Sequence, residues 1–275
     1  MIGPALRPGP VERALRGGVI AYIALLVAAP LVGLAVFGLA DGPAALVERI
    51  GAPVARAALW LTLWTALLVG VIDVLLGAAT AWVLVRYRFP GRALLSAAID
   101  LPLAIPTLVA GVMLAVLYGP DALLGARLAA AGLDVAFAPP GIVLALLFVT
   151  LPFVVRAVEP VLAEVDPAEE EAARTLGAGP WRTFRAVFLP AIGPAALSGG
   201  IRAVGRAVGE FGSLVVIAGN IPFETLTAPV YIFGEIESGA PRAAAAVAVA
   251  LLALALALHG ASRAIERRTG ARHGR

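Results

Sequence analysis

The sequence predicts an all-α membrane protein, a polytopic bundle of six transmembrane helices. Of its 275 residues, 61% are hydrophobic and 14% are charged, and the mean hydropathy is +0.95. An ordinary soluble domain is about 45–50% apolar and roughly 25% charged, so an excess this large requires burial in lipid. Runs such as Ile142 to Thr150 are apolar on every side, whereas the strands of a membrane barrel would alternate. The spans are therefore expected to be helices.

Six runs are long enough to cross a bilayer, because a membrane-spanning helix needs about 20 mostly apolar residues. They are Gly17 to Ala40, Ala57 to Val85, Leu94 to Tyr118, Gly141 to Val158, Ala191 to Ala218 and Ala243 to Ser262. The first run ends in Gly38-Leu39-Ala40, which resembles a signal-peptide cleavage site. Its length exceeds the about 7–15 residues of a cleavable apolar region, so we expect an uncleaved first span.

The placement of arginine predicts the orientation, because short cytoplasmic loops carry an excess of basic residues. All 21 basic residues are arginine. If the N-terminus is cytoplasmic, most of them fall in inside segments, and the outside loops hold only Arg49, Arg56, Arg127 and Arg242. We therefore expect both termini in the cytoplasm. The sequence lacks a soluble basic patch with stacking aromatics, so no nucleic-acid partner is expected. It also lacks cysteine, which excludes thiolate metal sites and cysteine nucleophiles.

These assignments predict three parts of the chain. Residues 1–56 hold an N-terminal tail, the first span and an outside loop. Residues 57–262 form a transmembrane domain of five spans, with a cytoplasmic loop at residues 166–190. Residues 263–275 form a cytoplasmic basic tail.

The loop at residues 166–190 contains the one markedly polar stretch in the middle of the chain, Asp166 to Gly177. It predicts a capped helix. Asp166 can accept hydrogen bonds from the first-turn amides, Pro167 suits the first helical position, and Glu169 occupies the acidic position of a capping box. Gly177 is expected to end the helix by adopting a positive φ.

A second short helix is expected from Pro180 to about Phe188, where Pro190 would stop it. Trp181, Phe184 and Phe188 have the spacing of residues on one helical side. Exposed aromatics in such a loop favour docking to another protein. They are equally typical of an amphipathic helix lying on the lipid surface. The residues alone do not choose between the two.

This loop resembles the E-A-A loop of bacterial ABC importer permease subunits. The resemblance lies in Glu171-Ala172-Ala173, in Gly177 after three further residues, and in the later Leu189-Pro190 and Pro194. It implies a type I ABC importer permease fold in which the loop occupies a groove of a cytoplasmic ATPase subunit. It also implies a set of ATPase-coupling residues, namely Glu171, Ala172, Ala173, Leu176, Gly177, Trp181 and Phe184.

The chain itself is not expected to be an enzyme or to bind a cofactor. It has no lysine and no phosphate-binding glycine loop ending in Gly-Lys-Ser/Thr. The resemblance therefore implies that ATP and Mg bind the partner ATPase. An intramembrane enzyme would need a nucleophile with a base, or clustered metal ligands. The only histidines, His259 and His273, make that class a poor fit. A membrane component that docks a cytoplasmic partner without transport is a third possibility.

Three further stretches resemble the T-type subunit of a sulfate/thiosulfate permease: Arg86 to Arg92, Leu151 to Arg156, and Gly209 to Asn220. Asp100-Leu101-Pro102 and Ile105-Pro106-Thr107 belong to the same likeness. The alternative is a molybdate or tungstate permease, which shares the Gly-Glu-Phe-Gly stretch. The resemblance implies a multi-pass protein of the bacterial inner (plasma) membrane. Its implied partners are a W-type second permease in a heterodimer, two ATPase subunits and a periplasmic sulfate/thiosulfate-binding protein.

Three charges in the fifth predicted span, Arg202, Arg206 and Glu210, are four residues apart and so share one helical face. Ionisable residues inside a membrane are functional candidates by default. In one interpretation the arginines attract the anion and Glu210 restrains them. In the other, Arg206 and Glu210 only neutralise each other. The predicted residues of the translocation pathway or gate are Thr107, Arg202, Arg206, Gly209, Glu210, Ser213 and Asn220.

Three other features of the sequence each allow two interpretations. Pro102 and Pro106 predict a bend in the third span, which either flexes during transport or is a static kink. Asp73, midway along the second span, is expected to be hydrogen-bonded inside the bundle unless it takes part in transport. The outside loop from Gly219 to Pro241 either contacts the binding protein or is a re-entrant turn that packs the bundle.

Overall fold

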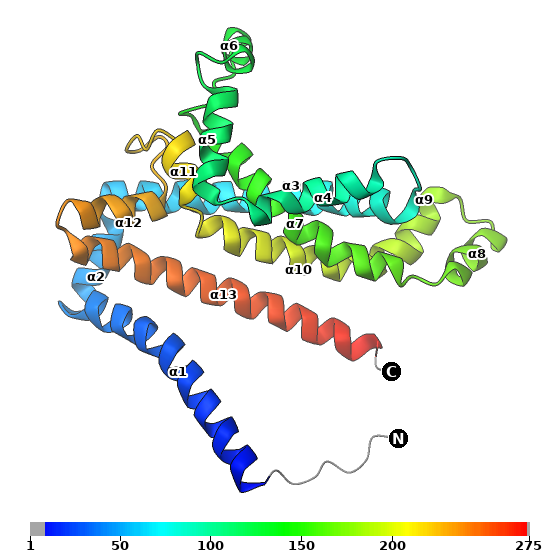
Figure 1. The fold of residues 1–275 in the computed structure, drawn as a ribbon, viewed down its shortest axis with the longest axis horizontal. Helices are drawn as coiled ribbons and strands as arrows, with labels where there is room; N and C mark the ends of the chain where they lie inside the picture. The colour runs from blue at the N-terminus through cyan, green and yellow to red at the C-terminus, as the bar shows by residue number, and fades with distance from the viewer. Residues whose placement is uncertain (1–8, 274–275) are drawn as a thin grey trace.

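The computed structural model describes residues 9–273, with side chains up to Ile265, and these residues form helices and loops without a strand. The first residues of the predicted N-terminal tail and the end of the predicted basic tail lie outside the described residues. The helices are α1 (Pro10–Leu39), α2 (Pro43–Gly51), α3 (Pro53–Arg86), α4 (Arg92–Ala104), α5 (Thr107–Tyr118), α6 (Leu123–Ala130), α7 (Pro139–Ala163), α8 (Pro167–Thr175), α9 (Pro180–Thr183), the π-helical turn η1 (Phe184–Phe188), α10 (Leu189–Val208), α11 (Gly212–Ile217), α12 (Ala228–Glu237) and α13 (Pro241–His273) (Figure 1).

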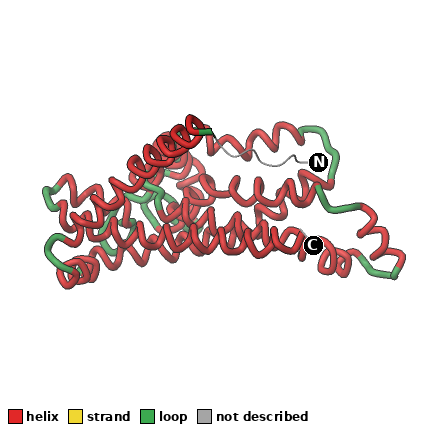
Figure 2. The backbone as a smooth tube through the Cα atoms, turned by 90° about the horizontal axis from the view of Figure 1, so that it is seen from below, coloured by secondary structure: helices red, strands yellow, loops and turns green. Residues whose placement is uncertain are grey.

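Among the described residues, five helical stretches are long and apolar enough to cross a membrane: α1, α3, α7, the continuous stretch Pro180–Val208, and α13. The pair α4 and α5 provides a sixth if the two helices count as one span. Each predicted run falls on one of these, so the prediction of a polytopic all-α bundle is confirmed. Figure 2 shows the long helices lying alongside one another, with the connections at the two ends of the bundle.

The predicted bend in the third span is present, but it is a break in the helix. The two parts, α4 and α5, meet at 113°. Pro106 precedes the first residue of α5, and Ile105 is extended, with φ −81° and ψ 131°. The residue before a proline is forced away from helical geometry. Pro102 lies inside α4 without ending it, so only one of the two predicted proline effects breaks the span.

Two predictions for the fifth span are also wrong. The helix does not continue to Ala218, because α10 ends at Val208 and α11 begins again at Gly212. Pro190 does not stop the preceding helix, since helical residues run from Pro180 to Val208 without interruption. The π-helical turn just before Pro190 explains this continuity. It shifts the hydrogen-bond pattern where the proline would otherwise clash with the carbonyl one turn earlier.

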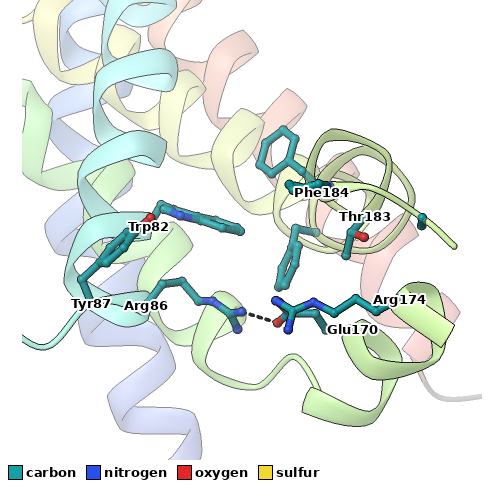
Figure 3. A pocket seen from close by; sticks show the side chains of 10 residues that line it. Trp82, Arg86, Tyr87, Glu170, Arg174, Thr183 and Phe184 are labelled. Carbon is teal, nitrogen blue, oxygen red and sulfur yellow. Dashed lines mark hydrogen bonds and ion pairs between the residues drawn. The ribbon is translucent and has the colours of Figure 1, made fainter.

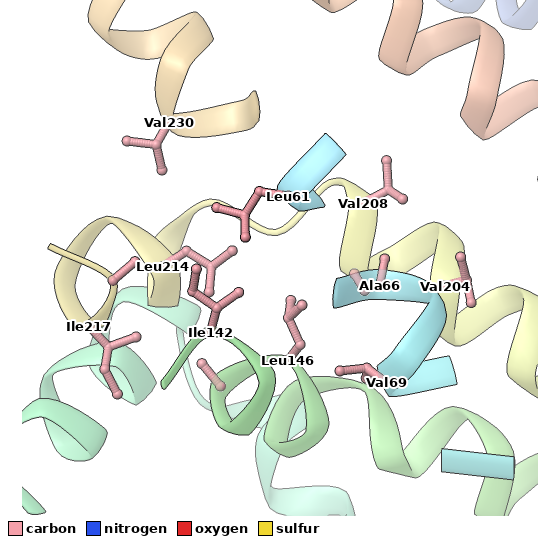
Figure 4. Close-up of a cluster of buried hydrophobic side chains, with 13 residues drawn as sticks. Leu61, Ala66, Val69, Ile142, Leu146, Val204, Val208, Leu214, Ile217 and Val230 are labelled. Atoms are coloured by element: carbon pink, nitrogen blue, oxygen red, sulfur yellow. The ribbon is translucent and has the colours of Figure 1, made fainter. Parts of the chain in front are cut away.

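The core lies where α3, α7 and α10 pack together. Small residues bring these helices close. A Cβ on Gly70 would lie 2.3 Å from the Val204 side chain, and one on Gly200 would lie 2.5 Å from Val74. Such small-residue contacts are typical of helix packing in membranes, where close van der Waals contact stabilises association. Figure 4 shows the buried cluster that fills one part of this core, drawn from α3, α7, α10, α11 and α12.

The bundle has two distinct ends. α8 and α9 lie at one end, toward which α13 runs, and α2 and α12 lie at the other (Figure 1). α1 diverges from the bundle, and none of its most apolar stretch is buried in the chain. Its contact with α13 is near its C-terminal end, where a Cβ on Gly38 would lie 2.9 Å from the Val249 side chain.

Candidate functional site

The polar loop folds as the sequence predicts. The Asp166 carboxylate accepts a hydrogen bond from the Ala168 backbone N–H at 2.9 Å, which caps α8. Gly177 follows the helix with φ +78°, a conformation that glycine adopts without steric cost. The Asp166 cap and the positive φ of Gly177 set the two ends of α8 and separate it from α9.

The predicted coupling residues form a mostly exposed surface on this loop. Leu176 is 86% exposed and Trp181 is 72% exposed. Glu171, Ala172 and Gly177 are also exposed, whereas Ala173 and Phe184 are half-buried. Large exposed apolar side chains beside a polar helix are typical of a surface that another protein or a membrane covers.

The three predicted aromatics lie on one side but are unequally buried. Trp181 stacks on Phe184 at 5.6 Å between ring centroids, and Phe184 meets the edge of Trp82 at 5.5 Å. Phe188 also contacts the Trp82 ring, at 4.8 Å between centroids. Phe188 is only 2% exposed, whereas Trp181 is 72% exposed, so the aromatic side runs from the exposed loop into the bundle.

An ion-pair network links α8 to the end of α3, and the sequence reasoning missed it. Glu170 pairs with Arg86 at the end of α3 and with Arg174 on its own helix, the latter at 2.5 Å (Figure 3). The Arg86 guanidinium also lies 4.9 Å from the Phe188 ring centroid and 5.6 Å from that of Trp82. The spacing of Glu170 and Arg174 indicates a helical pair, but no sequence signal points to Arg86.

The second group of predicted residues gathers at the corner between α10 and α11. Glu210 is 1% exposed, and one of its oxygens lies 2.6 Å from an Arg206 nitrogen. Its other oxygen accepts from the Ser213 backbone N–H at 2.8 Å and from the Ser213 hydroxyl at 2.9 Å. Glu210 therefore neutralises Arg206 and fixes the start of α11 with one carboxylate.

Thr107 belongs to the same corner, because α5 packs directly against α11. A Cβ on Gly212 would lie 2.2 Å from the Thr107 hydroxyl oxygen, and one on Gly111 would lie 2.6 Å from the Ser213 carbonyl oxygen. Gly209 is exposed and ends α10. The structure thus brings together five predicted pathway residues. They are Thr107, Arg206, Gly209, Glu210 and Ser213.

Two predicted pathway residues lie elsewhere. Arg202 lines a separate cavity of about 220 Å³ with His259 and Ser262 of α13. Asn220 lies beyond the end of α11 with φ +57°, and its side-chain amide donates to the Val215 carbonyl at 2.8 Å. The positive φ and this hydrogen bond give Asn220 a local role in ending α11.

Two polar contacts hold the bundle helices in register. Asp73 is fully buried in α3 and accepts a hydrogen bond from the Thr150 hydroxyl of α7 at 2.5 Å, so its predicted hydrogen bond inside the bundle is confirmed. Arg156 of α7 donates to both oxygens of Asp100 in α4, at 2.7 and 2.6 Å, and to Ser96. These hydrogen bonds of the Arg156 guanidinium join α4 to α7.

The predicted outside loop from Gly219 to Pro241 contains a helix that packs on the bundle. The Ala228 backbone N–H at the start of α12 donates to the Thr62 hydroxyl of α3 at 2.8 Å. Val230 and Tyr231 are buried, whereas Phe223 is 65% exposed. The segment therefore both packs the bundle and exposes an aromatic side chain, and contact with a binding protein stays a prediction.

Comparison with known proteins gives a consistent assignment. Residues 73–271 match the family described as "Binding-protein-dependent transport system inner membrane component". The chain is 49% identical over 185 residues to the probable sulfate transport system permease protein cysT of Chlorokybus atmophyticus, an alignment that covers 67% of this chain and 65% of that protein. It is 42% identical over 216 residues to the sulfate transport system permease protein CysT of Synechococcus elongatus, covering 78% of each.

The fold has a counterpart among solved structures. A chain of the crystal structure of a bacterial alginate ABC transporter, in complex with its pentasaccharide-bound periplasmic protein, matches with a TM-score of 0.76. The match covers 94% of both chains at 17% identity. At this identity the likeness shows the fold alone. Together with the family match and the apolar helices, it identifies a multi-pass membrane protein. The chain belongs to the family of binding-protein-dependent transport system inner membrane components.

Proposed function

We propose that the chain is a permease subunit of an ATP-driven importer of sulfate or thiosulfate in a bacterial inner membrane. The observation that carries this proposal is the exposed, capped helix α8, whose Glu170 is ion-paired to the end of α3. No residue of α8 is buried in the described part of the chain, so packing within this chain does not account for the helix. The substrate class rests on the named sulfate permeases that the chain resembles.

The connections of the loop explain how motion would reach the membrane. Trp181 lies on the same uninterrupted helical stretch as Arg206, since helical residues run from Pro180 to Val208. Displacement of the exposed end by an ATPase subunit would therefore move the α10–α11 corner directly. The ion pair between Arg86 and Glu170 would move α3 with it. Leu176 and Trp181 would supply the apolar contacts to the ATPase.

The corner around Arg206 supplies what a dianion requires. An uncompensated charge in a low-dielectric medium costs many kcal/mol, so the pathway must offer positive charge or donors. The Arg206 side chain is 32% exposed and is held by Glu210, so part of this side chain lies on a face that the described residues do not cover. We assign the anion path to this face, with a W-type second permease completing it and Arg202 extending it toward α13.

Further partners complete the proposal. Two ATPase subunits would bind ATP and Mg, and a periplasmic binding protein would deliver sulfate or thiosulfate to the end that carries α2 and α12. In this orientation α8 and both termini are cytoplasmic. The permease chain would bind no nucleotide and would catalyse no reaction.

Uptake by whole cells tests the substrate. Deletion of the gene is expected to abolish uptake of radiolabelled sulfate and leave molybdate uptake unchanged, and the restored gene should recover sulfate uptake. Loss of molybdate uptake with normal sulfate uptake would identify the alternative, a molybdate or tungstate importer. Unchanged uptake of both anions would contradict the proposal.

A further inference from the structure

A cavity of about 550 Å³ lies behind α8, between this helix, α9, η1 and the end of α3 (Figure 3). It is separate from the α10–α11 corner, and its residues include none of the predicted pathway residues. One wall is aromatic, formed by Trp82, Tyr87, Phe184 and Phe188. The other is polar and carries Arg86, Glu170, Arg174 and Thr183. A cavity with these two walls suits a ligand that has an apolar part and a charged part.

The charges that line the cavity do not balance. Two guanidinium groups, those of Arg86 and Arg174, share the single Glu170 carboxylate. The lining therefore has a net charge of about +1, which one monovalent anion would neutralise. Arg86 is pre-positioned by its contacts with the Trp82 and Phe188 rings. Arginine binds phosphate groups well, because its planar fork of donors matches their oxygens.

We propose that this cavity binds the phosphate group of an anionic phospholipid. The site lies where span α3 meets its polar loop, and Trp82 and Tyr87 occupy the position typical of aromatic residues at a membrane interface. A phosphodiester carries one negative charge, which matches the net charge of the lining. The aromatic wall would hold the glycerol and upper acyl chains. Basic pockets at helix ends on the cytoplasmic side are known to suit such head groups.

The bound phosphate would bridge Arg86 of α3 and Arg174 of α8. It would thereby hold the loop helix against the bundle, independently of which anion the protein transports. This inference does not rest on the proposed sulfate transport, because the test below measures lipid binding and not uptake.

Native mass spectrometry of the assembled complex tests the site. The purified complex is titrated with phosphatidylglycerol or with phosphatidylcholine of the same acyl chains, and the apparent Kd of the tightest lipid is determined. We expect the wild type to prefer phosphatidylglycerol. Arg174→Gln, at a side chain that is 68% exposed, removes one of the two guanidinium groups and with it the net positive charge of the lining. It should weaken phosphatidylglycerol binding about tenfold, as expected for one lost hydrogen bond to a charged group.

The matched control is Arg182→Gln, which removes an exposed arginine of the same loop that does not line the cavity. It should bind lipid like the wild type.

Inorganic phosphate distinguishes the two sources of the phosphate group. If the site is a lipid site, added phosphate leaves phosphatidylglycerol bound. Displacement by millimolar phosphate would instead indicate a free-anion site and would overturn the lipid assignment. Equal affinity for the two lipids in the wild type would overturn the proposal. A preference that Arg174→Gln leaves unchanged would overturn it too, and would indicate that an ATPase segment occupies the region.

Discussion

Glu210→Gln is expected to slow sulfate uptake about tenfold without disassembling the complex. The glutamine carbonyl can still accept both hydrogen bonds from Ser213, so the α10–α11 corner should persist. The substitution removes the negative charge of Glu210, which lies 2.6 Å from Arg206. In the proposed pathway Glu210 restrains Arg206, and without that restraint the arginine should hold the anion longer.

The magnitude follows from the geometry of the pair. Two unit charges whose centres are about 4 Å apart attract by about 4 kcal/mol at an effective dielectric constant of about 20. The Arg206 side chain is 32% exposed, so solvent screens part of this energy. If about 1.4 kcal/mol is transferred to the bound anion, its release slows about tenfold. Glu210→Ala also removes the acceptor for Ser213 and should lower the stability by about 3 kcal/mol, the lower end for a broken buried pair.

The assay is the initial rate of ATP-dependent uptake of radiolabelled sulfate into vesicles that contain the purified complex. The heat stability of each variant complex, followed by size-exclusion chromatography, is the control for folding. Arg206→Ala in the same assay should abolish uptake while assembly and ATPase binding persist. If Glu210→Gln and Arg206→Ala both transport at the wild-type rate, the pair serves only to neutralise itself, and the pathway assignment is refuted.

Three further predictions use other regions. Gly212→Ala places a methyl group against the start of α5 and should destabilise the complex by about 1–3 kcal/mol in heat-stability measurements. Gly193→Ala is the control, because nothing lies within 4 Å of the new Cβ, and it should not destabilise the complex. An equal loss of heat stability in the two variants would contradict the α5–α11 contact. Trp181→Ala should reduce copurification of the ATPase and uncouple its hydrolysis from uptake, whereas normal coupling would exclude Trp181 from the docking surface. The hydrogen bond from Arg49 lowers the pKa of Asp41, so the wild type should be more stable than Asp41→Asn at neutral pH. That difference should disappear as the pH falls through the folded-state pKa, and a difference that persists in acid would contradict this.

Local signals in the sequence were sufficient to predict the polar loop. Asp166 and Gly177 act on the backbone of their own helix, so their roles do not depend on distant residues. The six apolar runs were predictable for the same reason, because lipid imposes the same length and composition on every span.

The broken spans were not predictable from local sequence. Pro102 and Pro106 look alike in the chain, yet α4 continues through the first and ends before the second. The helix breaks at Pro106, next to the place where α5 packs on α11. There Gly111 and Gly212 allow close contact with residues about a hundred positions away in the chain. Such packing decides where a proline breaks a helix, and periodicity does not reveal it.

Long-range partners were missed for a related reason. Arg86 lies 84 residues from Glu170, and its basic segment indicated topology and a family resemblance but no partner. The burial of Phe188 was not predicted, because its spacing gives the side of the helix and not the depth at which the ring lies. Residue type identified the charged members of each site, and only the fold identified which of them meet.

In the proposed mechanism, ATP-driven motion of the loop at residues 166–190 carries sulfate across the membrane through this chain. The most direct test is sulfate accumulation in sealed vesicles that contain both permeases, the ATPase and the binding protein. We expect accumulation that requires ATP and the binding protein and that excess thiosulfate suppresses. An intact complex that hydrolyses ATP without accumulating either anion would contradict it.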